Sequence, residues 1–245
     1  MKHIIEAGTD AASMLLFDPK ALPDQYDEKA KDHPIELLEE ASKTGSAFWI
    51  NTGGDGAYLL HAFVDEDVPE YLLPYLFDEE SVGSFRVPSG RLYFTGAEYA
   101  FRDDDTFLRA HPHMGASFKL ARGQYNLSLF RAEYPEGLME NELREKVTPA
   151  AYYLHQSMGF LVMLAVAGVI SVIASFVEAW LLPATLPIGL GLVSMPFIVC
   201  MLPIFKATNK VWKEIQGRYP SVVAVLRADQ TGSLAEPDDQ TQCRD

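Results

Sequence analysis

The sequence predicts an α+β protein, with a β-rich cytosolic head domain followed by a two-helix transmembrane hairpin. Charge is the first indication: residues 1–150 hold 14 Lys and Arg against 27 Asp and Glu, whereas residues 157–205 hold a single charge, Glu178. The second indication is a series of short apolar segments in the head, separated by Gly, Pro, Asp and Asn, which is typical of strands. The average composition of the 245 residues, 48% hydrophobic and 22% charged, conceals this division.

The head is predicted to span residues 1–147. Segments rich in aromatic and β-branched residues, typical of strands, are 13–18, 47–51, 57–64, 84–87, 91–94, 116–121 and 125–134. Residues 34–45 are predicted to be helical, because a proline stands early, leucines follow on one face and a glycine ends the segment. A second helix, interrupted by proline, is predicted over 69–77. Together these elements predict a small β-rich domain.

Residues 148–205 are predicted to form the transmembrane hairpin, with spans over about 157–182 and 188–205. The first span has 26 residues, which at about 1.5 Å per residue reach roughly 39 Å, enough to cross a hydrocarbon core of ~30 Å with tilt. Two prolines within 183–187 favour a tight turn. The alternative, a helical hairpin buried in a soluble core, is disfavoured because both segments are apolar on every side.

Cations flank both ends of the hairpin and predict its orientation. Those that follow the second span are Lys206, Lys210, Lys213 and Arg218. Arg144 and Lys146 precede the first span, and the turn is uncharged, so the head and the C-terminus are expected in the cytoplasm, at the inner (plasma) membrane of a bacterium. The basic segment 206–227 suits anionic lipid headgroups or serves only as a topology signal. Residues 228–245 are polar and predicted to be disordered.

Small residues recur every four positions in the first span, at Ala167, Ser171, Ser175 and Ala179. Such a face allows another helix backbone to approach closely. The second span of the same chain is the expected neighbour, and contact in a homo-oligomer is the alternative. Glu178 is a carboxylate inside a span, which leaves two interpretations open: an anchor at the headgroup region or a functional group.

Motifs of known enzymes are absent: there is no Gly-x-Ser-x-Gly, P-loop, His-Glu-x-x-His or Cys-x-x-Cys. A candidate site for a divalent metal consists of Asp103, Asp105, His111 and His113, because imidazoles and carboxylates are its usual ligands. A solvated acidic turn is the alternative for this segment. No other cofactor is indicated.

A glycine-rich loop is the second candidate site. Gly53, Gly54, Asp55 and Gly56 could bind a cation or a phosphate-bearing ligand, although Gly-Asp-Gly between two strands is also ordinary hairpin chemistry. His61 follows in an apolar strand and is predicted to be a core histidine.

The segment AGTDAASMLLFDP at 7–19, followed by INTGGDGAYLLHAFV at 50–64, resembles a pattern in small bacterial β-domains of unknown function. In that pattern an Asp-small-small segment leads to a strand ending in Asp-Pro, and a Gly-Asp-Gly-x-Tyr hairpin follows. The resemblance covers the first third of the chain and carries no catalytic residue. It implies only that such domains sometimes neighbour bacterial toxins.

The composition favours a non-enzymatic interaction protein. A net charge of −13 over residues 1–150 repels nucleic acid and speeds association with a basic protein. The sequence therefore predicts a membrane-anchored protein whose acidic domain binds a protein partner, with immunity against a basic toxin as the concrete version. The alternative is a membrane-tethered ligand sensor or enzyme that uses the Gly-Asp-Gly loop and the Asp/His segment. A homo-oligomer is compatible with either interpretation.

Overall fold

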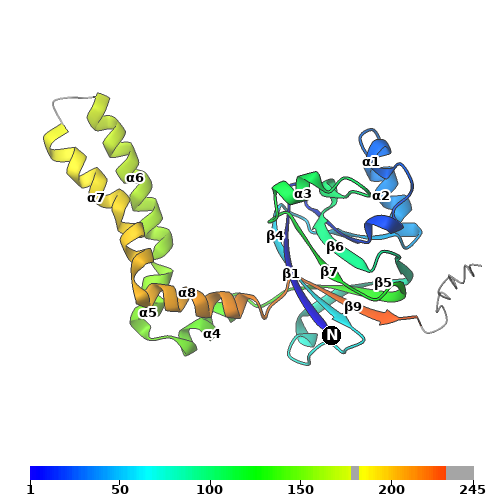
Figure 1. Cartoon of the computed structure of the whole chain (residues 1–245). Coiled ribbons are helices and arrows are strands. Elements are labelled where there is room, and N and C mark those ends of the chain that lie inside the picture. Colours follow the sequence, from blue (N-terminus) through cyan, green and yellow to red (C-terminus); the bar gives the residue numbers. More distant parts are fainter. Residues whose placement is uncertain (178–181, 230–245) are drawn as a thin grey trace, which may run out of the picture. The chain divides into compact units, whose positions relative to one another are not determined.

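The computed structural model describes residues 1–177 and 182–229, with side chains described outside 175–185. The chain divides into two compact units, and each is described by itself. Among the described residues, unit 1 contains 1–134 and 219–229, and unit 2 contains 135–177 and 182–218. The two sheets and the helices confirm the predicted α+β class (Figure 1).

Unit 1 consists of two packed sheets. The five-stranded sheet has the order β1 (Lys2–Thr9), β4 (Gly56–Val64), β9 (Val222–Ala228), β8 (Gly123–Ala132) and β5 (Leu76–Val87). The four-stranded sheet has the order β3 (Ala47–Asn51), β2 (Ser13–Phe17), β6 (Arg91–Gly96) and β7 (Gly115–Lys119). Neighbouring strands are antiparallel except β4 and β9, which are parallel. Alternate side chains of both sheets form the main core, as the period of two in a strand requires.

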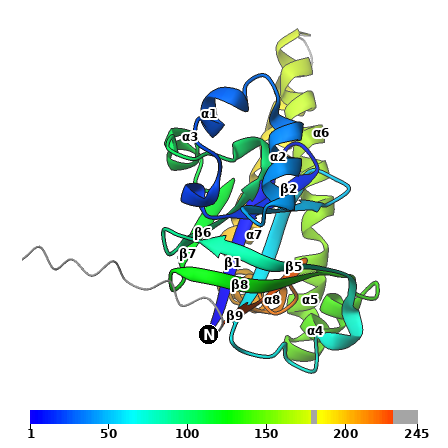
Figure 2. The ribbon, with the colours of Figure 1, turned by 90° about the vertical axis from the view of Figure 1, so that its right-hand side faces the viewer.

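Short helices cover the other face of the four-stranded sheet, where Figure 2 shows α1 (Tyr26–Lys29) and α2 (Pro34–Lys43). Helix α2 confirms the predicted helix over 34–45: a proline opens it, and Leu37, Leu38 and Ala41 are buried against the sheet. Helix α3 (Thr106–Ala110) belongs to the same layer. Single 3-10 turns lie at Pro19–Ala21, Leu73–Tyr75 and Ala97–Tyr99.

The predicted helix over 69–77 is wrong, because only the single 3-10 turn at 73–75 forms there. Strand β5 follows at once, with its acidic first half exposed at the edge of the sheet. An exposed edge strand lacks the apolar alternation by which strands are recognised in a sequence. Strand β1 was also absent from the predicted set.

Strand β9 is the main difference from the sequence-based organisation. It lies between β4 and β8, and Val222, Val223, Ala224 and Leu226 are buried. The segment assigned by sequence to a basic region beside the membrane therefore ends in a central strand of the head. Unit 2 is consequently an insertion between two neighbouring antiparallel strands, and its boundary replaces the predicted one at residue 147.

Unit 2 is helical. Its elements are α4 (Leu138–Lys146), α5 (Pro149–Gln156), α6 (Met158–Val177), α7 (Leu182–Met201) and α8 (Pro203–Gln216). Helix α5 begins as the Thr-Pro pair predicts, with the Thr148 hydroxyl accepting a hydrogen bond from the Ala151 N–H at 3.4 Å. Helices α6 and α7 lie side by side as a hairpin (Figure 1).

The close approach between α6 and α7 is made by glycines. A Cβ on Gly168 would lie 2.8 Å from the Gly189 carbonyl oxygen, a distance that no side chain tolerates. Of the predicted small-residue face, Ala167 is exposed and Ser171 is partly buried, whereas the neighbouring Gly168 is buried at the contact. Ala179, Glu178 and the side chain of Ser175 lie outside the described residues.

Within residues 1–177 and 182–229, no single helix has the length and apolar content needed to cross a membrane. Two bent pairs of helices reach that length and composition jointly. They are Pro149–Gln156 with Met158–Ala174, bent by 41°, and Leu186–Met201 with Pro203–Gln216, bent by 67°.

Candidate functional site

A groove of about 550 Å³ lies on the outer face of the five-stranded sheet, and we call it the outer groove. Strands β8 and β9 supply its floor, and the start of β5 with the preceding segment supplies its wall. Its lining residues are Asp67, Val68, Leu73, Leu76, Phe77, Glu79, Ser128, Phe130, Val225 and Arg227. Leu72 holds the wall against the sheet, because it is fully buried in a small cluster with Phe63 and Val223.

Apolar side chains remain exposed around this groove. Leu73 is 52% exposed and Phe77 is 37% exposed, and Tyr71, two residues before Leu73 in the chain, is 46% exposed. Water contact with such a contiguous apolar surface is unfavourable, and patches of this kind mark binding sites more often than ordinary surface. The outer groove therefore has the apolar centre that a protein interface requires.

The rim of the outer groove is acidic. Its lining cation, Arg227, forms an ion pair with Asp67. Arg131, which lines a separate pocket, forms one with Asp78. The Arg131 guanidinium also lies 5.1 Å from the centre of the Phe77 ring. No ion pair is formed by Glu79 within residues 1–177 and 182–229. An apolar side chain flanked by positive charge is thus the complementary ligand.

The predicted metal site is not formed. Asp103 accepts a hydrogen bond from Lys20, which holds the pKa of this carboxyl below its usual value. Asp105 forms an ion pair with Arg109 at 2.9 Å, and the His111 ring packs instead on an aromatic side chain. In the described part of the chain, no group of three or more His, Cys, Asp or Glu side chains is arranged to hold a metal ion.

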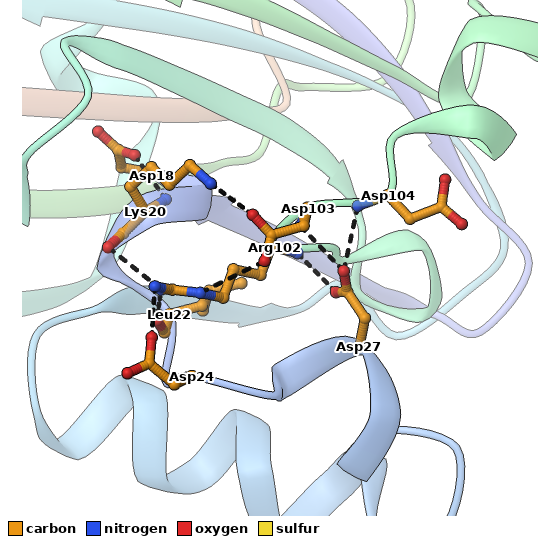
Figure 3. A network of polar contacts seen from close by, with 8 residues as sticks. All are labelled: Asp18, Lys20, Leu22, Asp24, Asp27, Arg102, Asp103 and Asp104. Atoms are coloured by element: carbon orange, nitrogen blue, oxygen red, sulfur yellow. Dashed lines mark hydrogen bonds and ion pairs between the residues drawn. The ribbon is translucent and has the colours of Figure 1, made fainter.

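The acidic run 103–105 has a structural role instead, shown in Figure 3. The Asp27 carboxylate accepts hydrogen bonds from the backbone N–H groups of Arg102, Asp103 and Asp104, at 2.6, 2.9 and 3.1 Å. The Arg102 guanidinium donates to the Leu22 carbonyl and to a nearby carboxylate. These contacts fasten α1 and the segment before it to the segment before α3.

Asp18 was not among the sequence candidates, although it is fully buried. Its carboxylate accepts hydrogen bonds from the Lys20 N–H at 2.9 Å and from the N–H and hydroxyl of Ser89 at 2.7 and 2.8 Å. Every observed contact of this carboxylate therefore serves to hold two turns together.

The Gly-Asp-Gly loop is closed by its own hydrogen bonds. Asp55 accepts from the Ala12 N–H at 3.0 Å, and the Gly54 carbonyl accepts from the Tyr58 hydroxyl at 2.6 Å. Gly53 has a φ of 74°, which favours glycine there. These contacts are those of a connection between strands, the ordinary interpretation of this loop.

A second groove of about 550 Å³, lined by Glu6, Gly8, Thr9, Asp10, Gly56, Ala57, His113 and Met114, brings together two of the sequence candidates. These are Gly56 and His113. The other groups that a sensor or enzyme would use are elsewhere: His61 is fully buried in β4, Asp55 is bound to the backbone, and Asp103 belongs to the network of Figure 3. The structure thus does not gather them into one pocket.

The four cations predicted at the membrane surface have two environments. Lys206, Lys210 and Lys213 are exposed on α8, whereas Arg218 forms an ion pair with Glu142. Sequence reasoning missed the outer groove entirely. The only local signal was the run of apolar residues over 71–77 between carboxylates, which was interpreted as a helix.

The site and fold define the head as a two-sheet α+β domain with an apolar, acid-rimmed groove.

The chain matches no protein-family model and no curated protein sequence. Among solved structures it is similar to the protein described as Crocagin biosynthetic gene J, at 14% identity with a TM-score of 0.37, over 62% of this chain and 86% of that one. It is also similar to ComJ from Bacillus subtilis, described as an inhibitor of the DNA degrading activity of NucA, at 12% identity with a TM-score of 0.33, over 53% of this chain and 81% of that one. Both TM-scores are too low to assign a fold or a partner to this chain.

Proposed function

We propose that this chain is a membrane-anchored bacterial interaction protein whose acidic head binds a basic protein partner in the outer groove. The observation that carries the proposal is the combination found there: exposed Leu73 and Phe77, a lining arginine already paired with an aspartate, and Glu79 without an ion pair in the described residues. Burying the exposed parts of Leu73 and Phe77 would contribute on the order of 1 kcal/mol each.

The charge of the head supports the same partner chemistry. Residues 1–134 hold 12 Lys and Arg against 23 Asp and Glu. Such a surface attracts a basic protein over a distance and raises its association rate by roughly 10- to 1000-fold at low salt. The concrete version of the proposal is an immunity protein that binds a basic toxin at the cytoplasmic face of the inner membrane.

The helical hairpin is the proposed anchor. Side chains on its outer surface are apolar and more than 60% exposed, namely Phe160, Met163, Ile170, Ile188, Phe197 and Met201. Helices α6 and α7 have 20 residues each, a length of about 30 Å. Each reaches the length and apolar content of a membrane span only together with its bent neighbour, α5 or α8. Lipid chains would cover the apolar surface that the α6–α7 contact leaves open.

The orientation of the proposed anchor follows from the insertion. Both ends of unit 2 continue into neighbouring strands of one sheet, β8 and β9, so the hairpin enters and leaves the membrane on one side. The exposed lysines of α8 support a cytoplasmic location for that side, because cations flanking a span favour it.

The test is capture of the partner by tagged, full-length chain in mild detergent, at low and at high salt. Glu79→Lys is compared with Glu36→Lys, which makes the same charge change on the exposed surface of α2. We expect a basic protein to be captured in stoichiometric amount and to be retained less at high salt. Glu79→Lys should bind this protein about tenfold less tightly than wild type, whereas Glu36→Lys should not. A partner retained equally by both variants would overturn the assignment to the outer groove, and a preparation that binds no protein would overturn the proposed function. For the immunity version, the partner must arrest growth alone and lose that effect when this chain is co-expressed.

A further inference from the structure

Helix α8 has two opposite faces. Phe205, Thr208 and Ile215 are buried on one side. Lys206, Lys210 and Lys213 are exposed, and their spacing of four and then three residues places them along a single stripe. With 100° of rotation per residue this lysine stripe lies on the side opposite the buried residues. Exposed Glu214 lies beside the stripe, four residues after Lys210, and forms no ion pair within the described residues.

The buried side of α8 packs on α4 and α5. The His155 ring of α5 lies 5.4 Å from the Trp212 ring and 6.2 Å from the Phe205 ring. Glu142 of α4 pairs with Arg218 and with Lys146, the latter at 3.0 Å. The apolar face of α8 is therefore already occupied by protein, and two of the nearby cations are neutralised.

The lysines of the stripe differ from these cations. Within the described residues of the chain, none of the three forms an ion pair with a carboxylate. Three ammonium groups on successive turns repel one another, which is unfavourable without a negative counterpart. Among the described residues of unit 2, Glu214 is the carboxylate next to the stripe, and one carboxylate does not balance three ammonium groups.

The bend between α7 and α8 turns the stripe toward one side. The two helices meet at 67° across residue 202, so α8 runs sideways from the foot of the hairpin. Within unit 2, Figure 1 shows α4 on the side of α8 that faces away from the hairpin tip. The lysine stripe lies opposite the side of α8 that packs on α4 and α5. With the hairpin in a bilayer, α8 lies close to the membrane plane and its lysines face the headgroups.

We propose that Lys206, Lys210 and Lys213 form a docking stripe for the phosphate groups of anionic lipids. The inference rests on the membrane anchoring proposed above and adds a lipid preference to it. Each ammonium group near a negatively charged bilayer surface raises the affinity for that surface by about fivefold. Three such groups together raise it on the order of a hundredfold. Arg218, engaged with Glu142, is not part of the stripe.

The experiment uses the full chain in two stages. First, the protein is reconstituted into vesicles of phosphatidylcholine alone and floated on a density gradient after a carbonate wash. Second, the detergent-solubilised chain is titrated with short-chain phosphatidylglycerol and with phosphatidylcholine, and bound lipids are counted by native mass spectrometry. The variant is Lys206→Gln with Lys210→Gln and Lys213→Gln. The control carries Lys29→Gln, Lys31→Gln and Lys43→Gln, the same charge change at exposed positions of the head.

We expect flotation of all three proteins, and a preference for phosphatidylglycerol that is lost by about a hundredfold in the stripe variant and kept in the control. Failure to float with phosphatidylcholine would overturn the anchoring itself. Flotation with equal lipid preference in wild type and stripe variant would overturn the lipid stripe and leave the anchor standing. Equal loss in the stripe variant and the control would assign the preference to net charge and would also overturn the stripe.

Discussion

Removal of unit 2 should leave a folded head, whereas removal of β9 should not. The first variant joins Tyr134 to Tyr219 through a linker of four Gly and Ser residues. The connection is short enough because the Ala132 N–H donates to the Ser221 carbonyl at 3.0 Å and the Tyr134 hydroxyl donates to the Pro220 carbonyl at 2.9 Å. This variant keeps every strand of both sheets, with a short loop in place of the helices.

The second variant ends at Tyr134 and therefore lacks β9. It loses Val222, Val223 and Leu226, each at most 2% exposed, and burial of each contributes about 1.5–3 kcal/mol. The ladders of β4 and β8 also lose their shared partner, which leaves backbone groups in the sheet unpaired. The summed loss, at least about 5 kcal/mol, is comparable with the whole stability of a typical domain, ~5–15 kcal/mol.

Circular dichroism and amide proton NMR distinguish the two outcomes. We expect dispersed amide signals and one cooperative thermal transition for the linked head, and neither for residues 1–134. A truncated chain that melts cooperatively at the temperature of the linked head would refute the central position of β9. An unfolded linked head would refute the division into two units.

Three further results are expected. Gly168→Leu should separate the helices of the hairpin and lower its melting temperature in detergent, whereas Ala167→Leu, on the exposed side, should not. Arg102→Ala should lower the free energy of unfolding of the linked head by about 1–3 kcal/mol in urea titration, because carbonyl and carboxylate partners lose their donor. The pKa of Asp103 is lowered in the folded state, so its contribution to stability is present above the ordinary carboxyl pKa and is lost as the pH falls through the folded value. In Lys20→Met, carboxyl NMR titration should return the pKa of Asp103 toward its ordinary value of 3.8, and an unchanged titration would contradict the role of the hydrogen bond.

Several elements of the fold were predictable because their signals are local. The apolar segments of β2, β3 and β4 lie between turn residues, and α2 shows its proline start and buried stripe within ten residues. Strand β9 has no such signal, because its partners are more than 90 residues away in the chain. Following a basic helix, the same apolar residues suggested a membrane surface.

The candidate sites failed for a related reason. A sequence shows which possible metal ligands are close together in the chain. It does not show which distant cationic side chains will pair with those ligands in the folded protein. Asp103 and His111 are close in sequence, yet the Asp103 carboxylate accepts a hydrogen bond from Lys20, which is 83 residues away. The outer groove has the opposite property, since Leu73, Phe130 and Val225 come from three distant segments and carry no shared pattern.

The insertion between β8 and β9 also imposes an order of events during synthesis. Strand β8 is made before the helical hairpin, and β9 is made after it. The five-stranded sheet cannot be completed until the hairpin has been translated, and the floor of the outer groove requires both strands. A head with a complete outer groove therefore never exists before the helical hairpin has been synthesised.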